Sequence, residues 1–261
     1  MDDKYGCYLF LKQFTDKVIP VYALIDNGEF YLLNPAGTLD ALFARESKFI
    51  LKPRKGRGGA GVMLLQVIDN EYYVDGKYVA EFSDTYKRLK NYILNPYIQQ
   101  HPYAAKIYSN SLNSIRLLTC IQDGEVRIIR AGHRFGVERS GCVDNFSSGG
   151  IFTNIDLTTG VIENPVLWDD RRYRKCVVDE HPDTGEKITG VKVPNWERMT
   201  SQMMQLHQSI KFIKYVGWDI AITSEDFVII EANYASDLIG LQLKTPLLVE
   251  EGNKKFFSLY R

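Results

Sequence analysis

One strand–turn–strand segment, residues 215–233, constrains this chain more than any other stretch. Two apolar runs flank a polar turn at residues 223–226, which predicts an antiparallel hairpin. Asp219 lies in the first predicted strand, and Glu231 and Asn233 end the second. Because side chains two residues apart on a strand share a face, Glu231 and Asn233 point the same way, and the hairpin can bring Asp219 beside them.

These three side chains offer two carboxylates and an amide oxygen. Hard oxygen ligands of this kind suit Mg²⁺, which binds one or two carboxylates together with substrate phosphates. The alternative is an ordinary hairpin whose acidic groups end in solvent. Asp219 lies between Trp218 and Ile220, in a run too apolar for an ordinary surface strand. Because a buried carboxylate needs a partner or a metal, we expect Asp219, Glu231 and Asn233 to be metal ligands.

A second constraint is a basic, glycine-rich loop between two predicted strands, 49–53 and 62–68. Its sequence is Arg54-Lys55-Gly56-Arg57-Gly58-Gly59-Ala60-Gly61. Glycine lets backbone N–H groups approach an anion closely, and Lys52, Lys55 and the arginines supply positive charge. The alternative is a flexible hairpin loop, but this composition favours a cover over nucleotide phosphates. The loop is not a Walker motif, because it has no Gly-Lys-Ser/Thr and no helix follows it.

Arg116 lies among apolar residues in the predicted strand 113–122, which is followed by a return strand at 125–132. A guanidinium in such a strand must find an acid or a phosphate. A structural ion pair and a phosphate contact both remain open for Arg116.

Another short strand is predicted at 92–94, where Asn95-Pro96 ends it. Proline cannot donate a backbone hydrogen bond, so this strand ends there or lies at a sheet edge. The segment that follows, up to Pro102, can offer backbone groups to an adenine between two lobes.

The composition is that of an ordinary globular protein. The chain has 261 residues, of which 45% are hydrophobic and 25% charged, with no net charge. This balance argues for neither a nucleic-acid partner nor an anionic membrane surface. We find no apolar run long enough for a membrane span and no signal peptide. Four scattered cysteines predict a reduced, cytoplasmic protein, and four dispersed histidines argue against a zinc site.

Antiparallel turns and a few amphipathic helices indicate an α+β fold. The clearest helix is predicted from Asn195, as N-cap, to about Lys214, with a stripe of apolar residues that is typical of a core-facing helix. Residues 161–194 are expected to be rich in loops with short strands.

Taken together, these features resemble the ATP-grasp superfamily, in which two α+β lobes with antiparallel sheets clamp ATP. The resemblance covers nearly the whole chain and is closest to the sugar-transfer-associated branch. The matching segments are Lys4 with the helix after it, Leu51-Lys52-Pro53 with the glycine loop, Arg116, Asp144-Asn145 with Gly149-Gly150, Val193-Pro194-Asn195-Trp196, and Asp219 with Glu231 and Asn233. It implies a small lobe at residues 1–93 and a large lobe at 94–261.

The resemblance also implies roles for individual residues. Lys4 and Lys52 would hold the α- and β-phosphates, and the loop with Lys55, Gly58, Gly59 and Gly61 would close over them. Asn95, Tyr97 and Ile98 would meet the adenine. Asp219, Glu231 and Asn233 would bind one or two Mg²⁺. The catalytic residues would be Lys52, Arg116, which faces the γ-phosphate or an acyl-phosphate, and Asn145, which lines the reaction centre beside Gly149-Gly150.

Two features depart from the family pattern. The family often has an acidic residue in the strand that links the lobes, where this chain has Asn95-Pro96. The chain also starts almost at the first ATP-site lysine, without the separate N-terminal domain that helps relatives bind the acceptor. We therefore expect that a dimer mate or a partner subunit completes the acceptor site, or that this branch is minimal.

The resemblance implies an ATP- and Mg²⁺-dependent carboxylate–amine ligase that works through an acyl-phosphate, with small-molecule carboxylate and amine substrates linked to sugar or polysaccharide modification. One alternative is a kinase on the same scaffold, with a hydroxyl acceptor and Asp144 as base. The other is a non-catalytic ATP-binding partner subunit. Asp219→Asn or Glu231→Gln is expected to abolish turnover and leave the fold intact.

Overall fold

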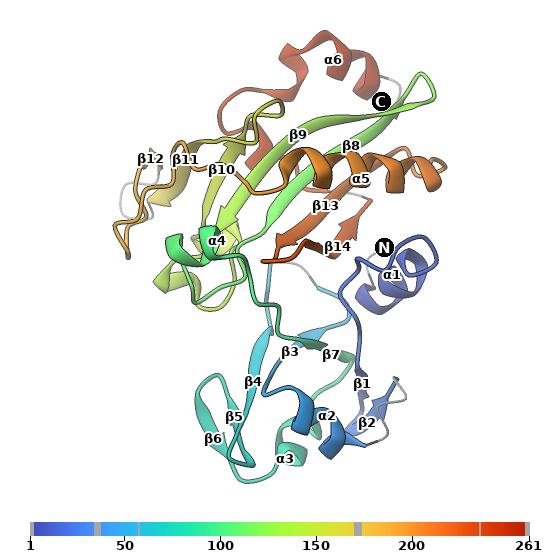
Figure 1. Cartoon of the computed structure of the whole chain (residues 1–261), viewed down its shortest axis with the longest axis vertical. Helices are drawn as coiled ribbons and strands as arrows, with labels where there is room; N and C mark the ends of the chain where they lie inside the picture. Colours follow the sequence, from blue (N-terminus) through green and yellow to red (C-terminus); the bar gives the residue numbers. More distant parts are fainter. Residues whose placement is uncertain (1–2, 34–37, 57, 170–173, 235, 259–261) are drawn as a thin grey trace. The chain divides into compact units, whose positions relative to one another are not determined.

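The computed structural model describes residues 3–33, 38–56, 58–169, 174–234 and 236–258 (Figure 1). The chain divides into two compact units, Met1–Gln99 and Gln100–Arg261. Each unit contains one seven-stranded sheet in which all the described pairings are antiparallel. The α+β class predicted from the sequence is confirmed. The lobe boundary expected between residues 93 and 94 falls within a strand of the first unit.

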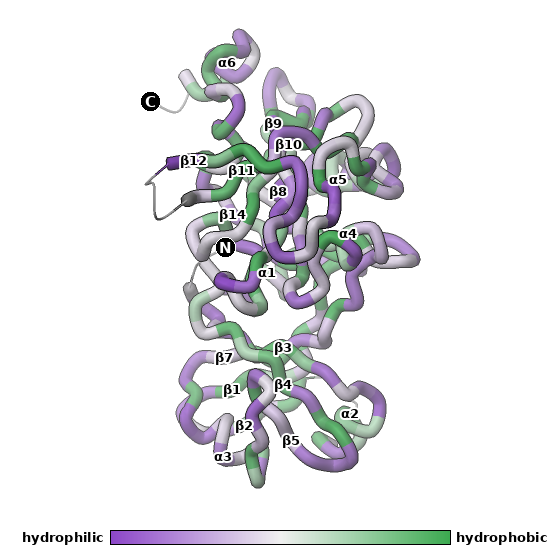
Figure 2. The backbone as a smooth tube through the Cα atoms, turned by 90° about the vertical axis from the view of Figure 1, so that its left-hand side faces the viewer, coloured by the Kyte–Doolittle hydropathy of each residue, from purple (hydrophilic) through white to green (hydrophobic). Residues whose placement is uncertain are grey.

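The first unit has the strand order β2-β1-β7-β3-β4-β5-β6. Its strands are β1 (Ala23–Asp26), β2 (Glu29–Leu32), β3 (Lys48–Pro53), β4 (Met63–Ile68), β5 (Glu71–Val74), β6 (Lys77–Val79) and β7 (Tyr92–Pro96). Its helices are α1 (Lys4–Leu11), α2 (Leu39–Arg45) and α3 (Phe82–Tyr86). Figure 2 shows hydrophobic residues along β3 and β4, and Phe49, Leu51 and Leu65 on these strands are fully buried. They form one core with Leu42 of α2 and Phe82 of α3.

Strand β7 corrects one sequence-based expectation. It does not stop before Asn95-Pro96 but runs to Pro96, which pairs with Phe49 of β3. The strand is also interior, between β1 and β3. Proline is tolerated at this position because the pairing with β1 already ends at Leu94, and Pro96 is the last residue of the strand.

The second unit has the strand order β12-β11-β10-β9-β8-β13-β14. Its strands are β8 (Ile115–Gln122), β9 (Glu125–Phe135), β10 (Ile151–Ile155), β11 (Ile162–Asp169), β12 (Arg174–Val177), β13 (Tyr215–Ile222) and β14 (Phe227–Asn233). Its helices are α4 (Pro102–Ile107), α5 (Trp196–Ser209) and α6 (Glu251–Ser258), with short 3₁₀ turns η1 (Glu138–Ser140), η2 (Phe146–Ser148), η3 (Gly240–Gln242) and η4 (Leu247–Val249). None of the helices in the described ranges is long and apolar enough to cross a membrane.

Helix α5 covers one face of this second sheet, as Figure 1 shows for β8, β9 and β13. Four residues of its expected apolar stripe are buried, namely Met199, Met203, Leu206 and Ile210, whereas Ile213 is partly exposed beyond the end of the helix. His207 reaches the Thr119 hydroxyl at 2.7 Å. The helix ends at Ser209, before the expected Lys214. Asn195 precedes its first residue, as predicted, but has a φ of 53° and its side chain makes no capping hydrogen bond.

The opposite face of the sheet is covered by the segment that follows β14. Leu118 of β8 and Phe152 of β10 pack there against Leu241, Leu247 and Phe256. Further along β8, the same face carries Arg116, because residues two apart on a strand share a face. The polar cluster described next therefore lies on this face.

Candidate functional site

The register of the second sheet gathers four polar residues on one face. Asp219 of β13 lies directly opposite Glu231 of β14 on one side and Arg116 of β8 on the other. Asn233 lies opposite Gly217, two residues before Asp219. The side chains of Asp219, Glu231, Asn233 and Arg116 therefore share a face, as the alternation along the hairpin predicts for the first three.

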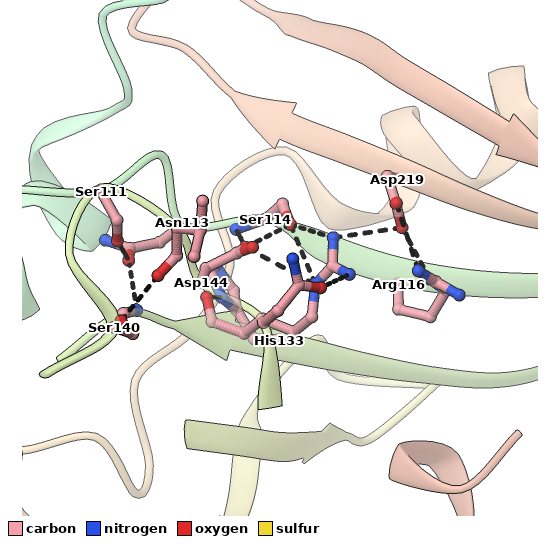
Figure 3. Close-up of polar contacts among 12 residues, drawn as sticks. Ser111, Asn113, Ser114, Arg116, His133, Ser140, Asp144 and Asp219 are labelled. Carbon is pink, nitrogen blue, oxygen red and sulfur yellow. Dashed lines mark hydrogen bonds and ion pairs between the residues drawn. The ribbon is translucent and has the colours of Figure 1, made fainter. Parts of the chain in front are cut away.

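The Asp219 carboxylate is buried and is paired with two guanidiniums, of which Figure 3 labels that of Arg116. Arg116 donates from Nε to Oδ1 at 2.6 Å and from Nη2 to Oδ2 at 3.2 Å. Arg134 of β9 adds a contact from Nη2 to Oδ1 at 3.2 Å. In this structure Arg116 is thus in an ion pair, which is one of the two options left open by the sequence.

Arg134 is a site residue that the sequence analysis missed. The return strand was expected to end at residue 132, whereas β9 continues to Phe135. With the strand extended, Arg134 falls on the same face as Gly132, which lies opposite Arg116. A longer return strand would place Arg134 on this face, because it follows Gly132 by two residues. This two-residue alternation was the signal that could have identified Arg134.

Several polar groups hold the Arg134 side chain. Nη2 and Nε donate to the Ser114 hydroxyl at 2.5 and 3.1 Å, and Nη1 donates to Oδ1 of Asn145 at 3.4 Å. Oδ2 of Asp144 lies 3.5 Å from Nε of Arg134 and accepts a hydrogen bond from the Ser114 backbone amide at 2.8 Å. Asn145, predicted to line the reaction centre, therefore touches a guanidinium that reaches Asp219.

The pKa values of the two buried aspartates in this cluster, Asp219 and Asp144, are shifted in opposite directions. Burial alone raises the pKa of Asp219, but the guanidiniums of Arg116 and Arg134 outweigh it and hold that pKa below its ordinary value. Burial raises the pKa of Asp144, and its contacts with Arg134 and Ser114 offset this only in part. The difference follows from the number of cations near each carboxylate.

The cluster offers hard oxygen donors for Mg²⁺. Among the described residues no three His, Cys, Asp or Glu side chains lie together as metal ligands. A cation here would therefore use Asp219, Glu231 and the amide oxygen of Asn233, with the remaining ligands from substrate phosphates. Oδ2 of Asp219 accepts one hydrogen bond, at 3.2 Å, and a carboxylate oxygen has two lone pairs. These oxygen donors fit a magnesium ion, and the carboxylate of Asp219 is at the same time paired with Arg116 and Arg134.

The expected phosphate-binding residues belong to the first unit. The Lys4 ammonium donates to the carbonyl of Gly56 in the glycine-rich loop at 2.9 Å, and the Lys4 amide donates to the Arg54 carbonyl at 2.9 Å. Asp3 caps α1 and pairs with Arg54 at 2.5 Å. The start of α1 and the loop, 52 residues apart in sequence, therefore lie side by side.

Lys52 and Asn95 share the face of the first sheet opposite its core. Lys52 lies opposite Ile93, and Asn95 lies opposite Ile50 on the neighbouring strand. Lys52 is buried, whereas Lys55 is exposed. The loop glycines Gly56, Gly58, Gly59 and Gly61 all have positive φ, which other residues rarely adopt.

Asn95 carries an orphaned acceptor. It is fully buried, and its Nδ2 donates to the Pro20 carbonyl at 2.6 Å. Its Oδ1 is buried and has no hydrogen-bond partner among the described residues. A buried acceptor without a hydrogen-bond donor is energetically costly, and the exocyclic amine of adenine is a donor that could satisfy it. Tyr97 and Ile98, the other two expected adenine contacts, are partly exposed.

His133 adjoins the cluster and is buried in the neutral form. The Arg134 carbonyl can only accept, so Nδ1 of His133 donates to it at 3.0 Å. Nε2 then accepts from the Tyr103 hydroxyl of α4 at 2.7 Å. Burial lowers the pKa of His133 to about 3.

The free energy of unfolding is expected to decrease as the pH is lowered, because of His133. Between its unfolded pKa near 6.5 and its folded pKa of about 3, the unfolded chain binds the proton that the native state refuses. The free energy of unfolding should drop by about 2 kcal/mol from pH 6.5 to pH 5 through this residue. Urea titrations at both pH values measure the drop, and His133→Gln should reduce it. An equal drop in both proteins would contradict this assignment.

Comparison with known proteins gives three findings. The family model described as sugar-transfer associated ATP-grasp matches residues 1–253. No curated protein matches. Many solved structures share the fold.

Three of these structures illustrate the similarity. D-alanyl-alanine synthetase A from Vibrio cholerae is 10% identical with a TM-score of 0.51, over 98% of this chain and 63% of that one. N5-carboxyaminoimidazole ribonucleotide synthetase, in an ADP complex, is 9% identical with a TM-score of 0.50, over 90% and 45%. The ATP-grasp ligase PsnB, with a minimal precursor, is 12% identical with a TM-score of 0.48, over 99% and 60%. The chain thus spans less than two thirds of the length of each of these proteins.

The family match extends from the first lysine of the expected ATP site to beyond the hairpin with Asp219 and Glu231, and the fold agrees with it. The chain belongs to the sugar-transfer associated ATP-grasp family, and its two antiparallel sheets form the ATP-grasp fold.

Proposed function

We propose that this protein is an ATP- and Mg²⁺-dependent ligase that joins a carboxylate to an amine through an acyl-phosphate. The observation that carries the proposal is the single sheet face that holds Asp219, Glu231 and Asn233 beside Arg116 and Arg134. This face combines oxygen donors for a cation with two cations that can bind anionic oxygens.

Phosphoryl transfer of this kind depends on positioning and on neutralising charge. Bound Mg²⁺ would neutralise phosphate charge. Arg116 and Arg134 present guanidiniums to developing negative charge, which suits the planar oxygens of phosphates and carboxylates. Oδ1 of Asn145 accepts a hydrogen bond from Nη1 of Arg134 and so helps to orient this guanidinium.

In the first unit, Lys4, Lys52 and the glycine-rich loop would hold the phosphates. Lys4 already binds the loop through Gly56, so the loop and this ammonium act as one element. The loop would close over the nucleotide and exclude water, which protects an acyl-phosphate from hydrolysis. The orphaned Oδ1 of Asn95 would accept a hydrogen bond from adenine.

The class of acceptor is proposed from the family description, which associates this branch with sugar transfer. We infer a carboxylate or an amine attached to a sugar or a polysaccharide precursor as one substrate. Formation of a C–N bond is supported by proteins of similar fold, which include D-alanyl-alanine synthetase A.

A kinase on the same scaffold has less support. It would need Asp144 as base, and Asp144 is buried and held by Ser114 and Arg134. Release of ADP with a phosphorylated product and no free phosphate would indicate a kinase. Binding of ATP without any turnover would indicate a non-catalytic subunit.

The proposal is tested by thermal shift with a non-hydrolysable ATP analogue, with and without Mg²⁺. We expect a Mg²⁺-dependent rise in Tm, because a ligand that binds only the folded state adds about 2.7 kcal/mol at a hundredfold excess over its Kd. No rise under either condition would contradict nucleotide binding. A positive result leads to screening carboxylates and amines for phosphate release.

Lys52→Ala is expected to weaken binding of the analogue about tenfold, since a phosphate would lose a charge-assisted contact worth about 1.5 kcal/mol. Lys77→Ala is the matched control, because Lys77 is an exposed lysine of β6 in the same unit. Isothermal titration measures both affinities. Equal affinity of the Lys52 variant and the wild type would remove Lys52 from the site.

A further inference from the structure

The Asp219 carboxylate has an unusual distribution of hydrogen bonds for a cation ligand. Oδ1 accepts from Nε of Arg116 at 2.6 Å, and Nη2 of Arg134 lies 3.2 Å from the same oxygen in an ion pair. Among the described residues, Oδ2 accepts a hydrogen bond from Arg116 alone, at 3.2 Å. A divalent cation at Asp219 would lie close to two guanidiniums, and like charges at such a distance repel strongly.

Arg116 and Arg134 differ in the hydrogen bonds and counterions that each would keep without its contact to Asp219. Arg116 makes two contacts with Asp219, and its other bond is to the Ser236 hydroxyl at 2.6 Å. Without Asp219, that hydroxyl would be the remaining hydrogen-bond partner of Arg116 among the described residues. Arg116 is therefore the firmly bound partner.

Arg134 has alternatives to Asp219. It makes one contact of 3.2 Å with that carboxylate. It also has two bonds to the Ser114 hydroxyl, one to Asn145, and a second carboxylate, Asp144, at 3.5 Å. If the contact with Asp219 breaks, the guanidinium keeps a counterion and most of its hydrogen bonds.

We propose that Arg134 and the divalent cation are alternative partners of Asp219, and that Asp144 is the counterion that keeps Arg134 in place when the cation binds. This inference rests on the proposed function, because it takes the cation site at Asp219 and Glu231 as given. Arg134 occupies the carboxylate in the nucleotide-free protein and opposes cation binding there. Cation binding releases Nη2 of Arg134 from Asp219, which makes that N–H group available to a substrate anion.

The test measures Mn²⁺ binding to nucleotide-free protein by electron paramagnetic resonance of the free ion. Arg134→Gln is expected to bind Mn²⁺ about tenfold more tightly than the wild type, because a competing positive charge is gone. Arg198→Gln is the matched control: it removes the same charge from an exposed arginine, which pairs with half-buried Asp226, and should change the affinity by less than about twofold. Unchanged or weaker binding by folded Arg134→Gln, including no binding by either protein, overturns the inference.

The role of Asp144 is tested by a double-mutant cycle. Asp144→Asn should weaken Mn²⁺ binding in the wild type, because Arg134 then depends on Asp219. In the Arg134→Gln background the same change should have less than half of that effect on the logarithm of Kd. An equal effect in both backgrounds means that Asp144 acts on the cation directly, which overturns its assignment as the alternative counterion.

A second measurement keeps the inference testable if Arg134→Gln does not fold. The arginine side-chain ¹⁵N spectrum of the wild type is recorded with and without Mg²⁺. The Nη2 resonance of Arg134 should shift as the contact with Asp219 breaks, while its Nε resonance, bonded to Ser114, should change less. No change in the Nη2 resonance at saturating Mg²⁺ would overturn the exchange. The thermal shift with nucleotide reports separately on the proposed function, so the two failures are distinguishable.

Discussion

Asp219→Asn should lower the free energy of unfolding by about 3 kcal/mol at pH 7 and abolish nucleotide turnover. The asparagine keeps an acceptor for one guanidinium but removes the negative charge that lies between Arg116 and Arg134. Removing one partner of a buried ion pair leaves an uncompensated charge, which is strongly destabilising. Urea titration followed by circular dichroism measures the loss.

The sequence predicts that this variant leaves the fold intact, and the two guanidiniums around Asp219 add an expected loss of stability. The pH dependence provides a further check. Because the pKa of Asp219 is lowered in the folded state, its contribution is complete above its ordinary pKa of 3.8 and is lost as the pH falls through the lowered value. The difference between variant and wild type should therefore shrink in acid.

Asp123→Asn is the matched control for this substitution. Asp123 pairs with Lys255 at 2.7 Å, and both side chains are exposed. An exposed pair contributes little, so the control should change stability by less than about 0.5 kcal/mol. Equal stability of Asp219→Asn and the control would show that the two arginines do not depend on Asp219.

Gly217→Ala is expected to destabilise the protein by about 3 kcal/mol and to disturb Arg116. A Cβ at this position would lie 2.2 Å from Oγ and 2.4 Å from Cβ of Ser236. Ser236 is held on both sides, since its carbonyl accepts from the Tyr215 hydroxyl at 2.8 Å and its Oγ accepts from Arg116. The new methyl group must therefore displace a residue that orients the guanidinium.

A second substitution decides whether the clash with Ser236 is the cause. Ser236→Gly in the Gly217→Ala background removes both clashing atoms and should restore more than half of the lost stability. Ser236→Ala in the same background keeps the clashing Cβ and should restore much less. Gly6→Ala is a control for the substitution itself, because its Cβ would meet no atom closer than 3.7 Å. Failure of Ser236→Gly to rescue would mean that the cost arises elsewhere.

The hairpin of Asp219 and Glu231 illustrates what local pattern can predict. The two strands were expected from apolar runs around a polar turn, and β13 and β14 form there. The shared face of Asp219, Glu231 and Asn233 follows from the two-residue period of a strand. The glycine-rich loop was also evident, because four glycines close together indicate backbone that needs positive φ.

Other features depended on distant contacts. Strand β9 continues past its expected end, and only this extension places Arg134 beside Asp219. Strand β7 includes Pro96 because pairing with β1 stops earlier. Strands were expected in the loop-rich stretch at 161–194, but only tertiary pairing places β11 and β12 beside β10 in the sheet.

The sequence by itself determined the elements, the α+β class and the oxygen donors at the end of the hairpin, because strand period, turn residues and glycine content are local properties. Only the tertiary structure decided the partners of those donors. Arg116 and Arg134 reach Asp219 from strands far earlier in the sequence, and Arg116 and Asp219 are 103 positions apart. Such a pairing depends on the order and register of β9, β8 and β13 in the sheet, which no local pattern specifies.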